Sequence, residues 1–398
     1  MTKYRTIDCI VLLSALVACS GIANEAAALP PAYTVTDLGT LGGSLSQGFG
    51  INASGQVAGW SYTIEDAAIH PFLWTPTTPG GAAGTMIDLG TLGGDTSGFG
   101  VGGWDVNDSG QVSGWSYIAG NAEIHAFLYD GTMHDLGTLG GRDSFGHGIN
   151  ASGQVTGASF TMAGTRAFLW TPTTPNSSTG TMIDLGSLGG SGSSGWAINA
   201  SGQVAGDSRT ISDANHAFLY DGTMHDLGTL GGRHSYALGI NEGGQVTGLS
   251  YVTGDATQHA FLWTPTTPNG VSGTMIDLGT LGGTYSSYAY GVNASGQVVG
   301  GSFTTGNAAR HAFIYSSGSG MVDLNSLIDP LSGWELELGT AINDAGQITG
   351  LGFNGSEGHA FLLTPVPEPA SLALLALGLP LIVWRNSRRF ADQKGTLS

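Results

Sequence analysis

Cysteine and lysine are almost absent from this 398-residue chain. Both cysteines lie within the first twenty residues, so the remainder has no disulfide framework, no thiolate metal site and no cysteine nucleophile. Between positions 24 and 366 there is no lysine, and five arginines face 26 acidic residues, a net charge of −21. Such a surface repels a phosphate backbone, so we expect no nucleic-acid partner.

Charged residues make up only 10% of the chain, whereas apolar residues reach 41%, which is enough to build a packed core. Glycine is abundant, at 68 residues, but it lacks the period of three that a collagen triple helix requires. The composition therefore indicates a folded, glycine-rich domain.

Residues 1–23 have the pattern of a secretory signal peptide. A basic start, with Lys3 and Arg5, precedes an apolar run over 10–18 that is too short to span a membrane. Small residues follow, so we expect a helical signal that is cleaved after Ala23. An alternative stays open, because residues 16–19 resemble a bacterial lipobox in which Cys19 would be acylated. Both interpretations predict export.

The C-terminal segment combines a Pro-Glu-Pro motif, an apolar run over 370–384 and a basic cluster, in that order. The motif and the cluster consist of Pro367, Glu368, Pro369, Arg385, Arg388 and Arg389. This arrangement resembles the PEP-CTERM sorting signal of Gram-negative bacteria. The resemblance implies an exosortase as the processing partner, commonly in species that make exopolysaccharide.

A helix over 370–384 would rise about 22 Å, less than the roughly 30 Å of a bilayer core. We therefore expect a transmembrane helix that tethers the precursor transiently at the inner membrane, with the arginines inside. A retained C-terminal anchor is the alternative. The predicted division is a signal peptide over 1–23, a repeat domain over 33–365, a sorting segment over 366–389 and a short cytoplasmic tail over 390–398. The expected destination is the cell surface or the extracellular space.

Internal repetition dominates the rest of the sequence. Three signatures, Asp-Leu-Gly-Thr-Leu-Gly-Gly, Asn-Ala-Ser-Gly-Gln and His-Ala-Phe, each occur seven times with small variations. The asparagine signature recurs about every 48 residues, a period typical of propellers and solenoids. It begins at Asn52, Asn107, Asn150, Asn199, Asn241, Asn293 and Asn343.

Each unit reads as four short antiparallel strands joined by turns, as in a blade of a β-propeller. The repeat begins with a lone fourth strand near Tyr33 and ends with a lone third strand that starts at His359. Pairing these two strands would complete a seventh blade and hide its edges. We therefore predict an all-β, seven-bladed β-propeller closed by its N- and C-terminal strands. A β-solenoid is the alternative.

The three signatures resemble the HAF-repeat family of probable extracellular bacterial proteins, over roughly 33–365. The resemblance implies an exported repeat protein and supplies no catalytic residue and no cofactor. Arg166 replaces the histidine in one copy, and Pro71 replaces the alanine in another.

The repeated histidines suggest metal ligands, but a ring would spread equivalent positions too far apart to share one ion. We expect them to bond backbone groups at the start of the third strand, and the repeated aspartate to bond turn amides. Repeated tryptophans are expected to pack between blades rather than to stack on sugars. No metal site is predicted, although so acidic a surface leaves calcium dependence open.

Differences between blades are a better guide to ligands. The connections between second and third strands carry acidic side chains that we expect to converge on one rim, and ligands often bind at such a rim. The candidate rim residues are Glu65, Asp66, Asp207, Asp213 and Asp255.

The sequence favours an exported, non-enzymatic propeller scaffold that binds exopolysaccharide or another envelope component. No catalytic residue is predicted, because no carboxylate pair, nucleophile elbow or phosphate loop stands out. The alternative is a propeller enzyme, a glycosidase or a polysaccharide lyase, with acidic loop residues as acid and base. Ionisable side chains that point into a central channel would support the enzyme.

Overall fold

The computed structural model describes residues 32–94 and 102–367, and all of the structure discussed below lies in these two ranges. The predicted signal peptide, the helix over 370–384 and the tail lie outside the described residues. Among the described residues, no helix is long and apolar enough to cross a membrane.

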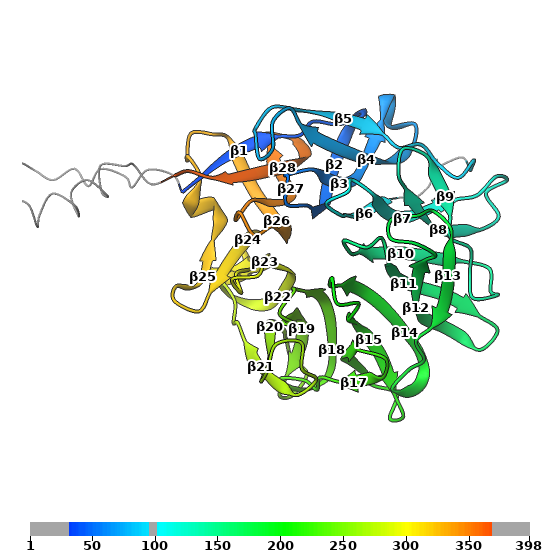
Figure 1. Ribbon diagram of the computed structural model, residues 1–398. Helices are drawn as coiled ribbons and strands as arrows, with labels where there is room; N and C mark the ends of the chain where they lie inside the picture. Colours follow the sequence, from blue (N-terminus) through cyan, green and yellow to red (C-terminus); the bar gives the residue numbers. More distant parts are fainter. Residues whose placement is uncertain (1–31, 95–101, 368–398) are drawn as a thin grey trace, which may run out of the picture. The chain divides into compact units, whose positions relative to one another are not determined.

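The described residues are all-β, with 28 strands: β2 to β25 form six consecutive groups of four, and β26 to β28 form a seventh group with β1 (Figure 1). The first strand of each group is the innermost and is followed by an Asn-x-x-Gly turn. These inner strands are β2 (Gly42–Ile51), β6 (Gly102–Val106), β10 (Ser144–Ile149), β14 (Gly189–Ile198), β18 (Gly231–Ile240), β22 (Gly282–Val292) and β26 (Trp334–Ile342). The second strands are β3 (Val57–Thr63), β7 (Val112–Tyr117), β11 (Val155–Thr161), β15 (Val204–Thr210), β19 (Val246–Val252), β23 (Val298–Thr304) and β27 (Ile348–Asn354).

The third and fourth strands carry the His-Ala-Phe and Asp-Leu-Gly signatures. The third strands are β4 (Ile69–Pro76), β8 (Ile124–Tyr129), β12 (Gly164–Pro172), β16 (Asn215–Tyr220), β20 (Gln258–Pro265), β24 (Arg310–Ser316) and β28 (Glu357–Pro365). The fourth strands are β5 (Gly84–Asp88), β9 (Met133–Asp135), β13 (Gly180–Asp184), β17 (Met224–Asp226), β21 (Gly273–Asp277), β25 (Gly320–Asp323) and β1 (Tyr33–Asp37). Three 3-10 turns complete the elements: η1 (Ile64–Asp66), η2 (Thr305–Asn307) and η3 (Leu324–Leu327).

The two ends of the repeat domain form one group. Strand β1 pairs antiparallel with β28, from Tyr33 opposite Pro365 to Asp37 opposite Phe361. This is the pairing that the phase of the repeats predicts. It gives the last group its fourth strand from the opposite end of the chain.

Five of the sheets contain four strands each, whereas the first and last groups merge into one mixed sheet. A single parallel bridge between Leu45 of β2 and Gly358 of β28 joins them. This departs from the prediction of purely antiparallel sheets. The physical reason is the missing side chain at Gly358, because a Cβ there would lie 2.5 Å from Leu45 Cδ1.

The core lies between neighbouring groups rather than within one of them. In one cluster, Ala126 and Leu128 of β8 pack against Phe168 and Trp170 of β12. The phenylalanine of every His-Ala-Phe copy is fully buried in this way, and Trp74, Trp170 and Trp263 join the same clusters, as predicted for packing between blades.

The second strands need glycine to pass over this core. A Cβ at Gly114 would lie 1.9 Å from the Gly102 carbonyl oxygen and 2.7 Å from the ring of Phe127. An alanine there would push apart the inner strand and the phenylalanine, so part of the high glycine content is a packing requirement.

Candidate functional site

Every inner strand has a register shift against the second strand at the same place, three residues before the repeated asparagine. Between β2 and β3, for example, Gly48 faces Gly59 and Gly50 faces Ala58, so Phe49 is the extra residue. A bulge of this kind turns a side chain out of the regular alternation of a strand. The residues at the seven shifts are Phe49, Trp104, His147, Trp196, Leu238, Tyr290 and Thr340.

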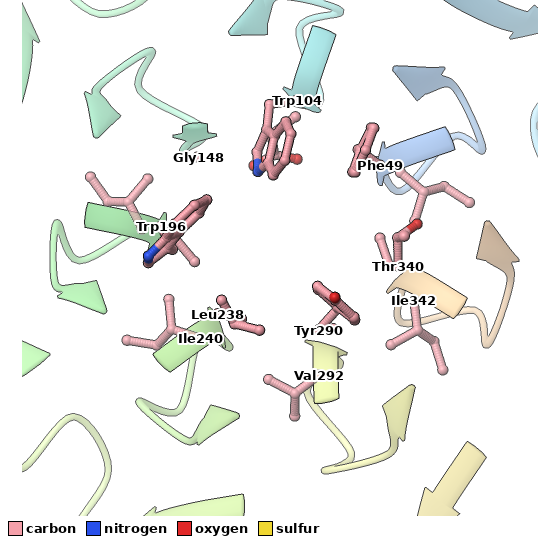
Figure 2. Close-up of a pocket in the computed structure, with 17 residues that line it drawn as sticks. Phe49, Trp104, Gly148, Trp196, Leu238, Ile240, Tyr290, Val292, Thr340 and Ile342 are labelled. Carbon is pink, nitrogen blue, oxygen red and sulfur yellow. The ribbon is translucent and has the colours of Figure 1, made fainter. Parts of the chain in front are cut away.

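Six of these seven bulge residues line one cavity of ≈ 190 Å³, which we call the aromatic cavity. Figure 2 shows Phe49, Trp104, Trp196 and Tyr290 pointing from different strands into the same space. The positions that follow the bulge residue are small or aliphatic in almost every group, whereas the bulge residue itself differs widely. The variable side chains of the repeat therefore meet in one place.

Four aromatic rings beside the aromatic cavity form two stacked pairs. Phe49 and Trp104 lie parallel with ring centroids 4.3 Å apart, and His147 and Trp196 lie parallel at 4.2 Å. The ring centroids of Trp104 and Trp196 are 6.1 Å apart, so the four rings form one cluster, of which Phe49, Trp104 and Trp196 line the cavity and His147 does not. Burial lowers the pKa of His147 to about 4, although the hydrogen bond from its Nδ1 to the Gly195 carbonyl opposes the shift. The ring is therefore neutral at physiological pH.

One carboxylate lies in the aromatic cavity. The residue after the bulge is glycine or alanine in six groups and aspartate, Asp105, in β6. Its Oδ1 accepts from the Val106 amide at 2.8 Å and its Oδ2 from the Ile149 amide at 3.1 Å. Burial raises the pKa of Asp105 to about 6, and these two backbone hydrogen bonds oppose the rise. Gly50 leaves the necessary room, since a Cβ there would lie 2.6 Å from Asp105 Oδ1.

The aromatic cavity adjoins a second cavity of ≈ 270 Å³, since six residues line both: Ile51, Asp105, Ile198, Ile240, Val292 and Ile342. The second cavity is lined by six of the seven repeated asparagines, by Asp105, which borders both cavities, and by three further acidic side chains, Asp108, Glu242 and Asp344. Each of these three further carboxylates accepts from the backbone amide of the preceding group's turn, at Ala53, Ala200 and Ala294 respectively. They are thus tied to the scaffold.

The repeated asparagines are themselves joined in a cycle. The Nδ2 of each one donates to the backbone carbonyl of the asparagine in the next group, at 2.9–3.3 Å, and the last, Asn343, donates to Asn52. These side chains were expected only to form turns. The cycle gives them a second function, which is to connect each inner strand to the next.

A second carboxylate, the partly buried Asp207, supports the wall of the aromatic cavity. It accepts from the Trp196 indole Nε1 at 2.7 Å, and burial raises its pKa to about 6 against the effects of Trp196 and Arg209. Asp207 was expected in a connection on the rim. It lies instead within strand β15, because the second strand of that group continues to Thr210 before the turn.

The other four rim candidates do lie in connections between second and third strands. Asp66 accepts from the amide and the hydroxyl of Ser44, and Asp255 accepts from the Arg233 amide, so both hold the start of their own inner strand. Asp213 pairs with Arg209, and Glu65 is exposed on η1. A ligand on this rim stays a prediction.

The prediction that the repeated histidines bond backbone groups is wrong, because they pair with carboxylates instead. Their Nδ1 atoms lie 2.6–2.9 Å from the carboxylate of the repeated aspartate on the neighbouring fourth strand. His359 makes this pair with Asp37 at the other end of the repeat domain. Arg166 keeps a cation near Asp184 where histidine is missing, with Nε 4.0 Å from Oδ2.

The repeated aspartates also accept from the glycine amide two residues on, as predicted for turn amides. The Asp88 Oδ1 to Gly90 nitrogen distance is 2.7 Å, and other copies match it. Within residues 32–94 and 102–367, no three histidine, aspartate or glutamate side chains are placed to hold a metal ion.

Comparisons with known proteins assign the C-terminal segment and the fold. Residues 365–389 match the PEP-CTERM protein-sorting motif, which indicates an exported protein of Gram-negative bacteria that an exosortase processes. The sequence matches no curated protein. The resemblance to the HAF-repeat family stays a prediction.

Among solved structures, the β-propeller domain of the trilobed protease from Pyrococcus furiosus is similar at a TM-score of 0.51 and 9% identity, over 80% of this chain and 95% of that one. The protein therefore has a β-propeller fold. A gluconolactonase from Xanthomonas campestris matches at a TM-score of 0.40 and 11% identity, over 85% of this chain and 95% of that one. A sialidase from Trypanosoma rangeli matches at a TM-score of 0.35 and 9% identity, over 93% of this chain and 59% of that one.

The fold corrects one expectation. The prediction that the chain is not an enzyme was wrong as an exclusion, because a β-propeller fold is compatible with catalysis as well as with binding.

Proposed function

We propose that this protein is an exported cell-surface or matrix protein whose aromatic cavity binds a carbohydrate of the cell envelope or of the exopolysaccharide. The observation that carries the proposal is the set of bulge residues, which vary between groups and six of which meet at one cavity. A side chain that served the scaffold alone would repeat with the scaffold, as the asparagines and phenylalanines do.

The proposed architecture is a seven-bladed propeller over 33–365, closed by β1 and β28. The cycle of asparagine hydrogen bonds supports it, since the last bond joins Asn343 to Asn52 across 291 residues of sequence. The contact between His359 and Asp37 supports it on the outer side. In a closed ring every blade has four strands and only short outer edges remain, which suits a protein outside the cell.

The lining of the aromatic cavity favours a carbohydrate. Aromatic rings provide apolar faces against which the C–H groups of a sugar ring can pack, and Asp105 can accept from a hydroxyl group. The size is sufficient for one ring, because an engineered cavity of about 150 Å³ holds benzene. Residues 1–23 would direct export, and the segment over 366–389, with its exosortase, would direct final placement.

The test is a titration of the full-length chain, in mild detergent, with a panel of glycans. Binding is measured by the change in tryptophan fluorescence. We expect saturable quenching, because Trp104 and Trp196 line the cavity. Trp104→Leu should weaken binding about tenfold, which corresponds to about 1.4 kcal/mol and is near the upper end for one aromatic contact. Trp60→Leu is the matched control, since Trp60 does not line the cavity. Equal losses in both variants would contradict a site at Trp104.

Cleavage of a glycan in the same cavity is the second candidate, and the pKa of Asp105 favours it. A carboxyl with a pKa of about 6 is suited to exchange a proton near neutral pH. The same titrations, read for shortened products, test this candidate. Asp105→Asn should abolish product release if Asp105 transfers the proton, and full activity in that variant would exclude this function for Asp105.

A further inference from the structure

We propose that the sugar recognised in the aromatic cavity carries a free ammonium group, so that the ligand is an amino sugar with an unacylated amine. This inference rests on the proposed carbohydrate binding and names the class of ligand. Asp105 would receive the ammonium, and the aromatic rings would surround it.

The position of Asp105 is the first argument. Asp105 directly follows the bulge residue of its group, where the other six groups have glycine or alanine. It borders the aromatic cavity. Its two oxygens are fixed by amides from two different groups, Val106 of β6 and Ile149 of β10. Each carboxylate oxygen has a further lone pair, so a donor in the cavity can still bind.

The aromatic lining is the second argument. Phe49, Trp104, Trp196 and Tyr290 face the cavity from four strands (Figure 2). Rings of this kind attract a cation through their negative faces, and cages of them recognise ammonium ligands. A carboxylate beside such a cage adds a charge-assisted hydrogen bond, which is stronger than a neutral one.

The charge around the cavity is the third argument. The residues that line the aromatic cavity include Asp105 but no lysine or arginine. The whole chain has a net charge of −18. Uronic acids and sulfated sugars would meet repulsion without a counter-charge, whereas a cationic sugar is attracted.

Burial also makes a cation favourable here. It raises the pKa of Asp105, which means that the ionised carboxylate is poorly solvated in the empty cavity. An ammonium group in contact with the carboxylate would relieve this penalty.

The experiment is calorimetric titration of the full-length chain in mild detergent at about pH 7, where Asp105 is largely ionised. The probes are two β-1,4-linked disaccharides, one of glucosamine and one of N-acetylglucosamine, which differ only in the acetyl groups. Tetramethylammonium is the third probe and carries charge without a sugar. We expect the glucosamine disaccharide to bind at least about tenfold more tightly than the other two.

Two substitutions to alanine locate the effect. Asp105→Ala installs the residue that β14 and β26 have at this position, Ala197 and Ala341, so the fold should tolerate it. It should reduce the preference for glucosamine to less than about twofold. Asp108→Ala is the control, because it removes the same charge three residues away in the second cavity, and four other groups have alanine there. Equal effects of the two variants would overturn the assignment to Asp105.

The outcomes separate this inference from the proposed function. Equal binding of both disaccharides would overturn the ammonium assignment and leave carbohydrate binding intact. Tetramethylammonium that binds as tightly as glucosamine would show a cation site without sugar recognition, and so overturn the amino sugar. If neither disaccharide and none of the panel glycans binds, the proposed function itself is overturned.

Discussion

Replacing Asp207 by asparagine should stabilise the folded protein at neutral pH. Asp207 lies on β15, and its carboxylate accepts from the Trp196 indole. Asparagine has nearly the same shape and keeps an oxygen for that hydrogen bond, but it cannot ionise. The substitution therefore removes the charge and little else.

The magnitude follows from the pKa of Asp207, which burial raises from 3.8 to about 6. A carboxyl with a raised pKa contributes stability that is complete below about pH 4 and is lost as the pH rises through about 6. The full difference corresponds to about 3 kcal/mol, and we expect about 1–3 kcal/mol because the side chain is only partly buried. Above about pH 7, Asp207→Asn should exceed the wild type in free energy of unfolding by this amount.

Urea unfolding of the full-length protein at about pH 7.5 and about pH 4 measures the effect. The advantage of the variant should be present at the higher pH and fall close to zero at the lower one. Glu65→Gln is the matched control, since Glu65 is exposed on η1, and its free energy of unfolding should change little. A variant that is no more stable than the wild type at the higher pH would refute the reasoning.

Two further predictions concern the acid range and the asparagine cycle. His147→Phe keeps the stacked ring but cannot bind a proton. Burial lowers the pKa of His147 to about 4, so the wild type loses up to about 3 kcal/mol of stability as the pH falls from about 6.5 to 4. The variant should not lose this stability. Urea unfolding at both pH values measures the difference. Asn343→Ala removes buried hydrogen bonds to the Asn52 carbonyl, the Gln347 side chain and the Gln347 amide, and should cost about 2–3 kcal/mol in chemical unfolding. Asp344→Ala, which loses one exposed bond to Ala294, is its control, and equal losses would contradict a stabilising cycle.

The strand content could be predicted from the sequence because each unit alternates apolar and small residues between clear turn signals. The pairing of β1 with β28 could also be predicted, since the lone strand near Tyr33 and the lone strand at His359 lack their partners elsewhere. Both inferences depend only on the order of the repeated signatures. They need no knowledge of side-chain contacts.

The partner of the repeated histidine could not be predicted in the same way. His125 and Asp135 are ten residues apart, whereas His70 and Asp88 are eighteen apart, because the loop between the third and fourth strands varies in length. The histidine and the aspartate still meet in both sheets, because the pairing of the third and fourth strands keeps the same register whatever the length of the loop. The sequence shows both residues as repeated but gives no constant spacing that would connect them.

The aromatic cavity was missed for a related reason. In a regular strand Phe49 would point opposite to both neighbours, but the bulge changes which face it occupies, so alternation does not assign it. A signal did exist. Aligning the seven units on the asparagine shows one highly variable column next to small residues, and a single acidic residue, Asp105, in the column after it.

A duplication within the chain shows where the units differ. Residues 125–142 are identical to residues 216–233, over the third strand, the fourth strand and the following link. The identity ends at Arg142 and Arg233, and four of the next seven residues, 143–149 and 234–240, differ. They include the bulge residue, which is His147 in one copy and Leu238 in the other. The outer strands hold the histidine–aspartate pair and have stayed the same, while the side chains around the cavity have changed. This contrast is expected if the outer strands serve the scaffold and the inner strands serve a ligand, as we propose.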